Sequence, residues 1–289
     1  MAVLALTSAK GAPGVSTTAL AMTLLWPRSA LLVEADPAGS SSVLAGYLRG
    51  TVDHSRGLLG LAMAHRHGEL RQALWTQTVA LPSAGAANRW LLPGLSDAAQ
   101  GPSTIGLWGP LAALLASLDD SDVDVLVDAG RAGAMHSPTP LLRRADVVLL
   151  VLDSSLPAVA AARARLGLLR EELAVASELD SASARLRLLL IGEGRPYDAG
   201  EISGSLGVPV LASLPWDPAN ANVLATGAPS GRRFDSSPLL RGTRAAINAC
   251  REMMAEHSDR LSPPKSDPAW TASAFRVAAD SRAGIGGLK

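Results

Sequence analysis

The sequence is poor in cysteine and in net charge, and it has no long apolar run. Cys250 is the single cysteine among 289 residues, so no disulfide can form within the chain, which fits a reducing compartment. Basic and acidic residues balance at 26 each, so no global field draws the chain to nucleic acid or anionic lipid. No run reaches the roughly 18 apolar residues of a membrane span, and residues 1–6 have no basic lead-in for a signal peptide. These absences predict a soluble, cytoplasmic protein.

Lysine is also scarce. It occurs three times, so 23 of the 26 basic residues are arginine. Lys265 and Lys289 lie near the C-terminus, which leaves Lys10 as the one lysine in the body of the chain. An ammonium group kept at that position indicates a site where a compact point charge works and a planar guanidinium does not. Chance is the alternative explanation.

The bulk composition is that of a folded protein. Hydrophobic residues make up 48% and charged residues 18% of the sequence, which excludes a disordered chain. The length suits one large domain followed by a tail. We predict a nucleotide-binding domain over residues 1–257 and a Pro/Ser/Gly-rich C-terminal tail over residues 258–289.

Short apolar runs alternate with helical patterns along the chain. This alternation predicts an α/β fold, a single three-layer α/β/α domain with a mainly parallel twisted sheet. The apolar runs expected to form strands are residues 3–6, 31–34, 123–128, 147–152, 186–191 and 208–214. The segments expected to be helical are residues 16–25, 107–118, 158–179 and 237–256, with residues 40–80 largely helical as well. A Gly/Pro/Ser-rich stretch surrounds the apolar residues 90–94.

A loop of small residues lies between the first predicted strand and the first predicted helix. Small residues at 9–18 let backbone N–H groups approach a phosphate, and the following helix N-terminus adds partial positive charge. Against the general pattern G-x-x-x-x-G-K-[ST], Gly14 and Ser16 match, whereas Ala9 and Val15 replace the first glycine and the lysine. The alternative is a tight turn in which Ser16 caps a helix.

Acidic residues follow two of the predicted strands. Asp36 comes after the second strand, and Asp128 ends a later one. Because the carboxyl ends of parallel strands meet at one edge of a sheet, both are expected to converge on the loop at 10–17. Ordinary turn formation at strand ends is the alternative.

Four segments together resemble the ParA/MinD family of P-loop ATPases. Residues 10–16 resemble its variant loop Lys-Gly-Gly-x-Gly-Lys-[Ser/Thr], with Lys10 as the signature lysine. Residues 34–37 are similar to its Asp-x-Asp-Pro segment, residues 123–128 to its Walker B strand, and residues 214–217 to its late Pro-x-Asp loop. The four segments occur in the family's order, and the resemblance extends over most of residues 1–250.

The resemblance implies ATP and Mg²⁺ as cofactors and a homodimer that forms on nucleotide binding. It assigns nucleotide contacts to Lys10, Gly11, Ala12, Pro13, Gly14, Val15, Ser16, Thr17, Pro215 and Asp217. Ser16 and Asp128 would hold the metal, and Lys10 and Asp36 would act in catalysis, Lys10 by reaching the partner's phosphates. The implied function is a switch that positions or partitions a cargo, either DNA or a pilus or secretion apparatus, together with a protein partner.

Several positions depart from the family pattern. Val15 stands where the second lysine would contact the phosphates, so we expect slow or impaired hydrolysis. Glu34 replaces the first Asp and adds a methylene where water would be positioned, and Pro13 has no N–H to donate. Gly192 and Glu193 lie where the family often has an Asn that contacts adenine. Trp216 is a candidate for stacking on a base, with a core or surface tryptophan as the alternative.

These departures keep other functions open. A non-hydrolysing scaffold that uses the same dimer surface is the main alternative. A GTPase of the same superfamily is a more distant one, because the sequence has no guanine-binding Asp motif at the sixth strand. Non-specific DNA binding is predicted as one option through a group of C-terminal arginines, with a solvated helix face as the other. That group consists of Arg232, Arg233, Arg241, Arg244 and Arg251. Residues 270–277 of the tail have helical apolar spacing but little basic charge, so any membrane affinity would be weak, and a partner-docking segment or plain disorder are the alternatives.

Overall fold

The computed structural model describes residues 2–11, 14–82, 86–118, 122–174 and 184–261. The chain divides into two compact units, Met1–Arg251 and Glu252–Lys289. Most of the predicted tail lies outside the described residues, so its helical spacing and the boundary after residue 257 stay predictions. The fold and the site described below belong to the first unit.

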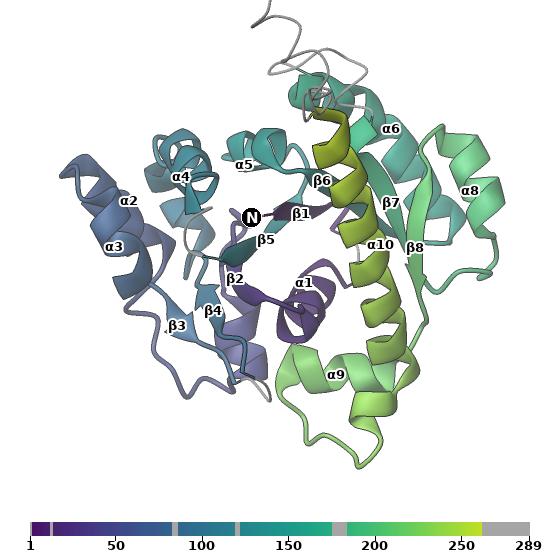
Figure 1. Cartoon of the computed structure of the whole chain (residues 1–289), viewed down its shortest axis with the longest axis horizontal. Helices are drawn as coiled ribbons and strands as arrows, with labels where there is room; N and C mark the ends of the chain where they lie inside the picture. Colours follow the sequence, from purple (N-terminus) through teal and green to yellow (C-terminus); the bar gives the residue numbers. More distant parts are fainter. Residues whose placement is uncertain (1, 12–13, 83–85, 119–121, 175–183, 262–289) are drawn as a thin grey trace, which may run out of the picture. The chain divides into compact units, whose positions relative to one another are not determined.

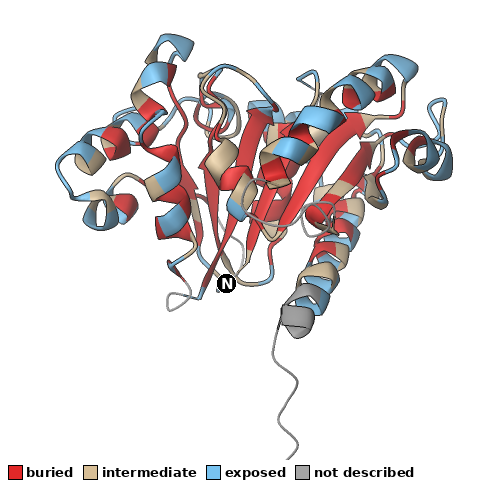
Figure 2. Ribbon diagram, turned by 90° about the horizontal axis from the view of Figure 1, so that it is seen from above, coloured by how far each residue is buried: buried red, intermediate tan, exposed pale blue. Residues whose placement is uncertain are grey.

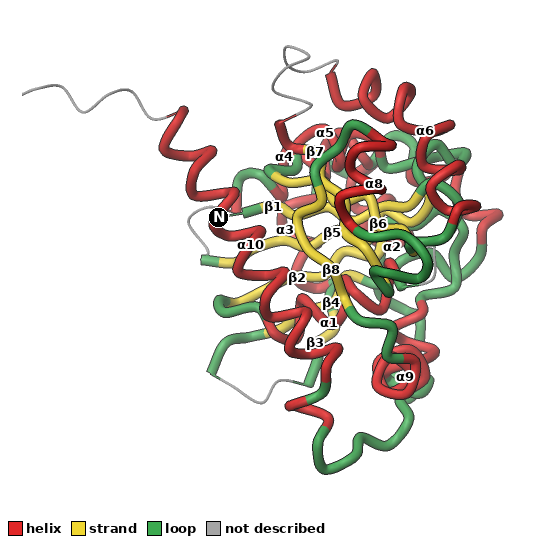
Figure 3. Tube along the Cα trace, turned by 90° about the vertical axis from the view of Figure 1, so that its right-hand side faces the viewer, coloured by secondary structure: helices red, strands yellow, loops and turns green. Residues whose placement is uncertain are grey.

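A single sheet forms the centre of this unit (Figures 1 and 3). In the described part of the chain its order is β3-β4-β2-β5-β1-β6-β7-β8, and every neighbouring pair is parallel except β3 with β4. The strands are β1 Val3–Ser8, β2 Ser29–Glu34, β3 Val79–Ala80, β4 Arg89–Leu92, β5 Val123–Arg131, β6 Val147–Asp153, β7 Leu186–Ile191 and β8 Val210–Leu214. The predicted, mainly parallel sheet is confirmed.

The central strands are apolar on both faces because helices cover both faces. In β6, the residues from Val147 to Leu152 are all buried. Side chains alternate between the two faces of a strand, so Val148 and Leu150 join one hydrophobic cluster while Leu149 points to the other side. Figure 2 shows the result, with buried strands lying between helices whose outer sides are exposed.

The helices form the two outer layers. One face of the sheet carries α4, α5, α6 and α8, with α2 and α3 beside them, and the other carries α1 and α9 with the first part of α10 (Figure 1). Their bounds are α1 Val15–Leu25, α2 Leu58–Arg66, α3 Leu70–Thr76, α4 Trp108–Leu115, α5 Thr139–Arg144, α6 Leu156–Ala174, α8 Ala199–Leu206, α9 Pro218–Thr226 and α10 Pro238–Leu261. The three-layer α/β/α architecture is therefore also confirmed. None of the described helices is both long and apolar enough to cross a membrane.

One face of helix α10 is part of the hydrophobic core. Leu239, Thr243, Ile247 and Cys250 are buried at the three- and four-residue spacing of one helix face. Burial raises the pKa of the Cys250 thiol to about 12, so the sulfur stays protonated and unreactive at neutral pH. Cys250 thus serves packing.

The structure differs from the sequence-based expectation in two regions. Residues 40–80 were expected to be largely helical, but a five-residue π-helical turn η1, Val43–Tyr47, is followed by non-helical residues 48–57. No strand was predicted in the Gly/Pro/Ser-rich stretch around residues 90–94, which contains β4, paired with β2. In both regions the backbone follows contacts with distant parts of the chain, α9 for η1 and β2 for β4, instead of local composition.

Candidate functional site

The loop between β1 and α1 is shaped by two glycines. Gly14 has a φ of 102° and precedes α1, where its carbonyl accepts a hydrogen bond from Thr18 N at 2.8 Å. Gly11 has a φ of 76°, and its N–H donates to Ser8 Oγ at 3.0 Å. Side chains rarely adopt such left-handed angles, so glycine lets the chain turn sharply into the helix. Ala12 and Pro13 lie outside the described residues.

A cavity of about 500 Å³ opens in front of this loop. It is lined by Ser8, Gly11, Gly14, Val15, Ser16, Thr17, Asp36, Ala38, Gly130, Arg131 and Ala134. The structure therefore brings the described loop residues together with the ends of β2 and β5. The N-terminus of α1 contributes free backbone N–H groups, which makes the cavity suited to an anion such as a phosphate.

Asp128, in the buried strand β5, lies beside this cavity, where it lines an adjoining cavity of about 210 Å³ together with Ser16 and Asp36. Its side chain is buried and accepts hydrogen bonds from the Ser16 hydroxyl and from Gly130 N, the latter at 3.0 Å. Burial, together with the nearby carboxylates of Glu34 and Asp36, raises the pKa of the Asp128 carboxyl to about 6, although its hydrogen bonds lower it. A carboxylate crowded by other acids is stabilised in its charged form by a nearby cation.

Asp36 is the acid that lines the phosphate-sized cavity. It follows β2, and its Oδ1 accepts a hydrogen bond from Ala38 N at 2.9 Å. Gly130 lies directly against it, because a Cβ placed on Gly130 would be 2.2 Å from Asp36 Cγ. The absence of a side chain at Gly130 thus allows the ends of β2 and β5 to approach each other.

Glu34 does not line the phosphate-sized cavity, but it lines the adjoining cavity of about 210 Å³ with Ser16, Asp36 and Asp128. Its buried carboxylate accepts hydrogen bonds from the Ser41 hydroxyl, from Val43 N at 3.1 Å and from Gly94 N at 3.3 Å. Burial raises the pKa of Glu34, and these hydrogen bonds oppose that rise. Glu34 therefore positions η1 and the segment after β4, whereas Asp36 lines the phosphate-sized cavity.

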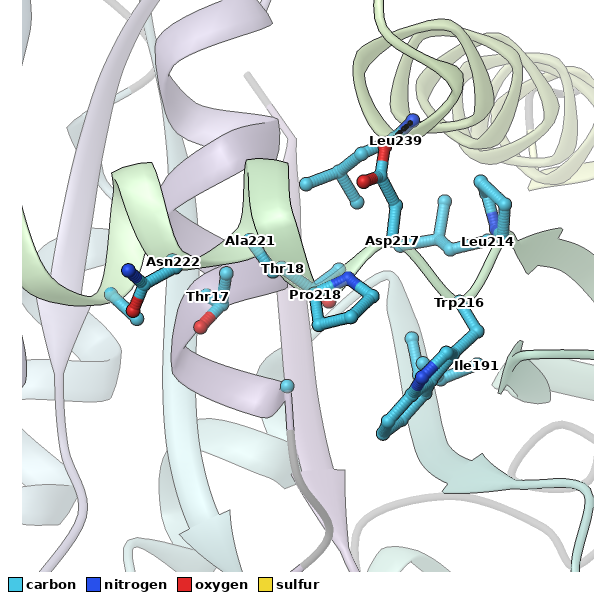
Figure 4. Close-up of a pocket in the computed structure, with 13 residues that line it drawn as sticks. Thr17, Thr18, Ile191, Leu214, Trp216, Asp217, Pro218, Ala221, Asn222 and Leu239 are labelled. Atoms are coloured by element: carbon cyan, nitrogen blue, oxygen red, sulfur yellow. Dashed lines mark hydrogen bonds between the residues drawn. The ribbon is translucent and has the colours of Figure 1, made fainter. Parts of the chain in front are cut away.

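A second, mostly apolar cavity of about 270 Å³ shares Gly14 and Thr17 with the first (Figure 4). Its other lining residues are Thr18, Ile191, Leu214, Pro215, Trp216, Asp217, Pro218, Ala221, Asn222, Ala225 and Leu239. The two predicted residues Pro215 and Asp217 are therefore brought to the loop, but on its apolar side. A planar apolar group fits this lining better than a charged one.

Asp217 is largely occupied by the protein itself. Its carboxylate caps α9 by accepting from Asn220 N at 3.3 Å, and it also accepts from Leu239 N at 3.3 Å, at the start of α10. Pro218 at the first position of α9 completes a favourable helix start. The side chain of Trp216 is 47% exposed and lies beside Ile191 in Figure 4.

Lys10 lies apart from the phosphate-sized cavity. It is exposed and lines another cavity of about 190 Å³, together with Asp153, Ser155 and Pro157 from the end of β6 and the start of α6. Val15 lines the phosphate-sized cavity but is 6% exposed. The described residues of the loop thus bring no positive side chain to their own cavity.

Arg131 is a cavity residue that the sequence patterns did not single out. It is the last residue of β5 and lines the phosphate-sized cavity. Its position three residues after Asp128 is the sequence signal that could have found it, because the strand end that carries Asp128 carries Arg131 too.

The C-terminal arginines are exposed. Arg244 donates to the carbonyl of Asp235 at 2.9 Å, and Arg241 donates to the carbonyl of Ser236. These two side chains therefore also order the turn before α10, and DNA binding by the group stays a prediction.

Comparison of the fold with solved structures finds the ParA and MinD proteins. A ParA family ATPase from Chlorobium tepidum matches with a TM-score of 0.63 and 16% identity, over 86% of this chain and 98% of that one. MinD from Pyrococcus horikoshii, solved with Mg-ADP, matches with a TM-score of 0.59 and 20% identity, over 87% and 95%. MinD in a MinC:MinD complex from Aquifex aeolicus matches with a TM-score of 0.60 and 17% identity, over 92% and 99%.

At the level of sequence, no protein-family profile and no curated protein matches the chain. The structural likenesses span nearly the whole length of each ParA or MinD chain. The fold is thus the P-loop ATPase fold of the ParA and MinD proteins, as the resemblance of the four sequence segments implied.

Proposed function

We propose that this protein is an ATP-binding dimeric switch of the ParA/MinD type that positions a cargo in the cell. The observation that carries the proposal is the hydrogen bond from the Ser16 hydroxyl to the buried Asp128 carboxylate beside the phosphate-sized cavity. In a P-loop ATPase these two residue types hold Mg²⁺ beside the nucleotide phosphates. Their contact here joins the first turn of α1 to the end of β5.

The residues at the site fit a nucleotide with its magnesium ion. The backbone of Gly11 and Gly14 and the N-terminus of α1 would receive the phosphates, with Thr17 between the two cavities. Ser16 and Asp128 would hold Mg²⁺, and Asp36 would orient the attacking water. Among the described residues no three His, Cys, Asp or Glu side chains are grouped as metal ligands. A magnesium ion keeps several waters and phosphate oxygens, so it does not need such a group.

Adenine is the base we assign to the apolar cavity. The lining of Ile191, Pro215 and Trp216 suits a flat ring, and Asn222 offers an amide for polar contact. The MinD structure from P. horikoshii holds Mg-ADP, which supports an adenine nucleotide here. Pro215 and Asp217 would shape this cavity, since Asp217 is engaged in starting α9 and α10.

Lys10 supports a dimer as the active form. Its exposed side chain lies outside the phosphate-sized cavity of its own chain, where it is free to reach the phosphates of a partner. The MinC:MinD complex supports a further protein partner. The cargo we propose is DNA or a pilus or secretion apparatus in the cytoplasm, with hydrolysis or release of the nucleotide resetting the dimer.

A non-hydrolysing scaffold is the second candidate, and Val15 is the observation that favours it. An isopropyl group cannot stabilise charge on a transferring phosphoryl group. Nucleotide binding and dimerisation would then persist while turnover is lost.

The test is to measure Mg-ATP binding, dimerisation and phosphate release for the wild type and for Lys10→Ala. We expect the wild type to bind Mg-ATP and to dimerise with it, and Lys10→Ala to dimerise at least tenfold less well. Exposed Arg66 on α2 provides a matched control, Arg66→Ala, which should behave as wild type. Absence of binding at millimolar Mg-ATP would refute the switch, and tight binding and dimerisation without phosphate release would favour the scaffold.

A further inference from the structure

We propose that Arg131 is the cation that holds the nucleotide phosphates within its own protomer, in place of the loop lysine that Val15 replaces. The inference rests on the proposed function, because it concerns the same phosphate-sized cavity. It assigns to the end of β5 a role that the loop before α1 would otherwise have.

The charges around the cavity require a cation in this protomer. Asp36 lines the cavity, and Asp128 lies beside it. A triphosphate would add several further negative charges to this acidic surrounding, and Mg²⁺ offsets only part of them. Arg131 is the sole basic residue among those that line the cavity in the described part of the chain.

Neither Val15 nor Lys10 can supply this positive charge within the protomer. Val15 is apolar and 6% exposed, so it brings neither charge nor hydrogen-bond donors. Lys10 lines the separate cavity beside Asp153. A positive charge from the same protomer therefore has to come from the strand side of the cavity.

The backbone around Arg131 is fixed against the start of the loop. Arg131 is in register with Ser8, and Ala132 N donates to the Ser8 carbonyl at 2.8 Å. One residue earlier, the carbonyl of Gly130 accepts from Thr7 Oγ1 at 3.0 Å. These contacts fix the backbone of Arg131 against Thr7 and Ser8, at the start of the loop that carries Gly11, so its side chain starts from a defined position at the cavity.

The guanidinium itself is available. Arg131 is exposed, and within the described residues no hydrogen bond or ion pair involves its guanidinium. A guanidinium presents a planar fork of donors that binds two phosphate oxygens at once, and it keeps its charge at any physiological pH. Binding of a phosphate would thus cost Arg131 no existing contact of this kind.

The experiment compares Mg-ATP affinity of the full-length wild type with Arg131→Ala, Arg131→Gln and Arg131→Lys, with Arg66→Ala as control. We expect Arg131→Ala and Arg131→Gln to bind Mg-ATP about 10- to 100-fold more weakly, which is the usual effect of losing a hydrogen-bonded charge. Arg131→Lys should lose less, because it keeps the charge but not the fork. The melting temperature without nucleotide should not change, because Arg131 is exposed.

Rescue provides a second measurement. Returning a lysine to the loop in the double variant Val15→Lys/Arg131→Ala should recover at least half of the lost affinity on a logarithmic scale. Because Val15 is buried, this variant is scored only if its melting temperature matches that of Val15→Lys alone; otherwise Arg131→Lys decides the question.

The outcomes separate this inference from the proposed function. If the wild type binds Mg-ATP and the Arg131→Ala and Arg131→Gln variants bind it equally well, Arg131 does not hold the phosphates and the proposed function stands. If the wild type does not bind Mg-ATP at all, both fail. Equal losses in Arg131→Gln and Arg131→Lys would also overturn the inference, because they would show that charge is not what matters.

Discussion

At the scale of single residues, Asp128 combines burial with negative charge. The pKa of its carboxyl is about 6, against an ordinary value of 3.8. Between these two values the folded protein keeps a proton that the unfolded chain has released. The free energy of unfolding therefore falls as the pH rises through this window and levels off above pH 6. Asp128 costs stability at neutral pH, as a residue kept for a ligand would.

The substitution Asp128→Asn tests this cost. The amide is uncharged, so the stability of the variant relative to wild type should improve by about 2 kcal/mol between pH 4.5 and pH 7.5. Urea denaturation without nucleotide at both pH values measures the change. Asp235→Asn, at an exposed carboxylate, is the control and should show no such change. A difference between Asp128→Asn and wild type that stays constant with pH would contradict the prediction.

The same scale shows what sequence patterns can and cannot reveal about a site. The patterns identified Asp36 and Ser16 because motif spacing ties them to a strand end and a helix start. They did not reveal that the Glu34 carboxylate is engaged by the protein itself, since this depends on donors at Val43 and at the distant Gly94. They also missed Arg131, because its spacing from Asp128 matches no known motif and gains meaning only when the sheet brings it beside Ser8.

At the scale of elements, two glycines in helical segments have opposite surroundings. Gly46 in η1 packs against α9 so closely that a Cβ would lie 1.9 Å from the Ala225 carbonyl oxygen. Gly167, in the middle of α6, is exposed, and a Cβ there would meet nothing within 4 Å. Gly46 is required by its contact with α9, whereas Gly167 only lowers the stability of α6.

Replacing each glycine with alanine should therefore have opposite effects. Gly46→Ala should destabilise the fold by about 2–4 kcal/mol, because η1 or α9 must move to remove the overlap. Gly167→Ala should stabilise it by about 0.5–1 kcal/mol through better helix propensity. Thermal and urea denaturation of the two variants measure both values. Equal effects of the same sign would show that the contact between η1 and α9 is not a constraint.

Elements differ in how far sequence predicts them. The inner strands β5, β6 and β7 were predicted, because burial on both faces makes them continuous apolar runs. Strand β4 was not, because it begins at Arg89 within a Gly/Pro/Ser-rich stretch. The side chain of Arg89 is buried and donates to the carbonyls of Trp26 and Arg28, so its place in the sheet depends on contacts that its own segment does not encode.

At the scale of the whole molecule, removing residues from the C-terminus tests which part of the chain completes the hydrophobic core. Every buried hydrophobic residue in the described chain lies at or before Cys250. We expect a chain that stops after residue 257 to keep its free energy of unfolding within about 1 kcal/mol of the full-length protein, because its core is complete. A chain that stops after residue 237 loses the buried face of α10 and should not fold cooperatively.

Urea denaturation of the two truncated proteins checks this expectation, and Mg-ATP binding by the longer one tests the proposed site at the same time. A loss of more than 2 kcal/mol on removal of residues 258–289 would place part of the core in the tail.

The contact of η1 with α9 has a consequence for anyone who redesigns this protein. Glu34 fixes one side of η1, Gly46 fits without slack against α9, and α9 supplies Ala221 and Ala225 to the apolar cavity. Widening that cavity for a larger ring by shifting α9 would push η1 and strain the Glu34 network. Trp216 and Ile191 line the same cavity but take no part in the contacts between Glu34, η1 and α9. Substitutions at these two positions should therefore change the base preference without straining the fold.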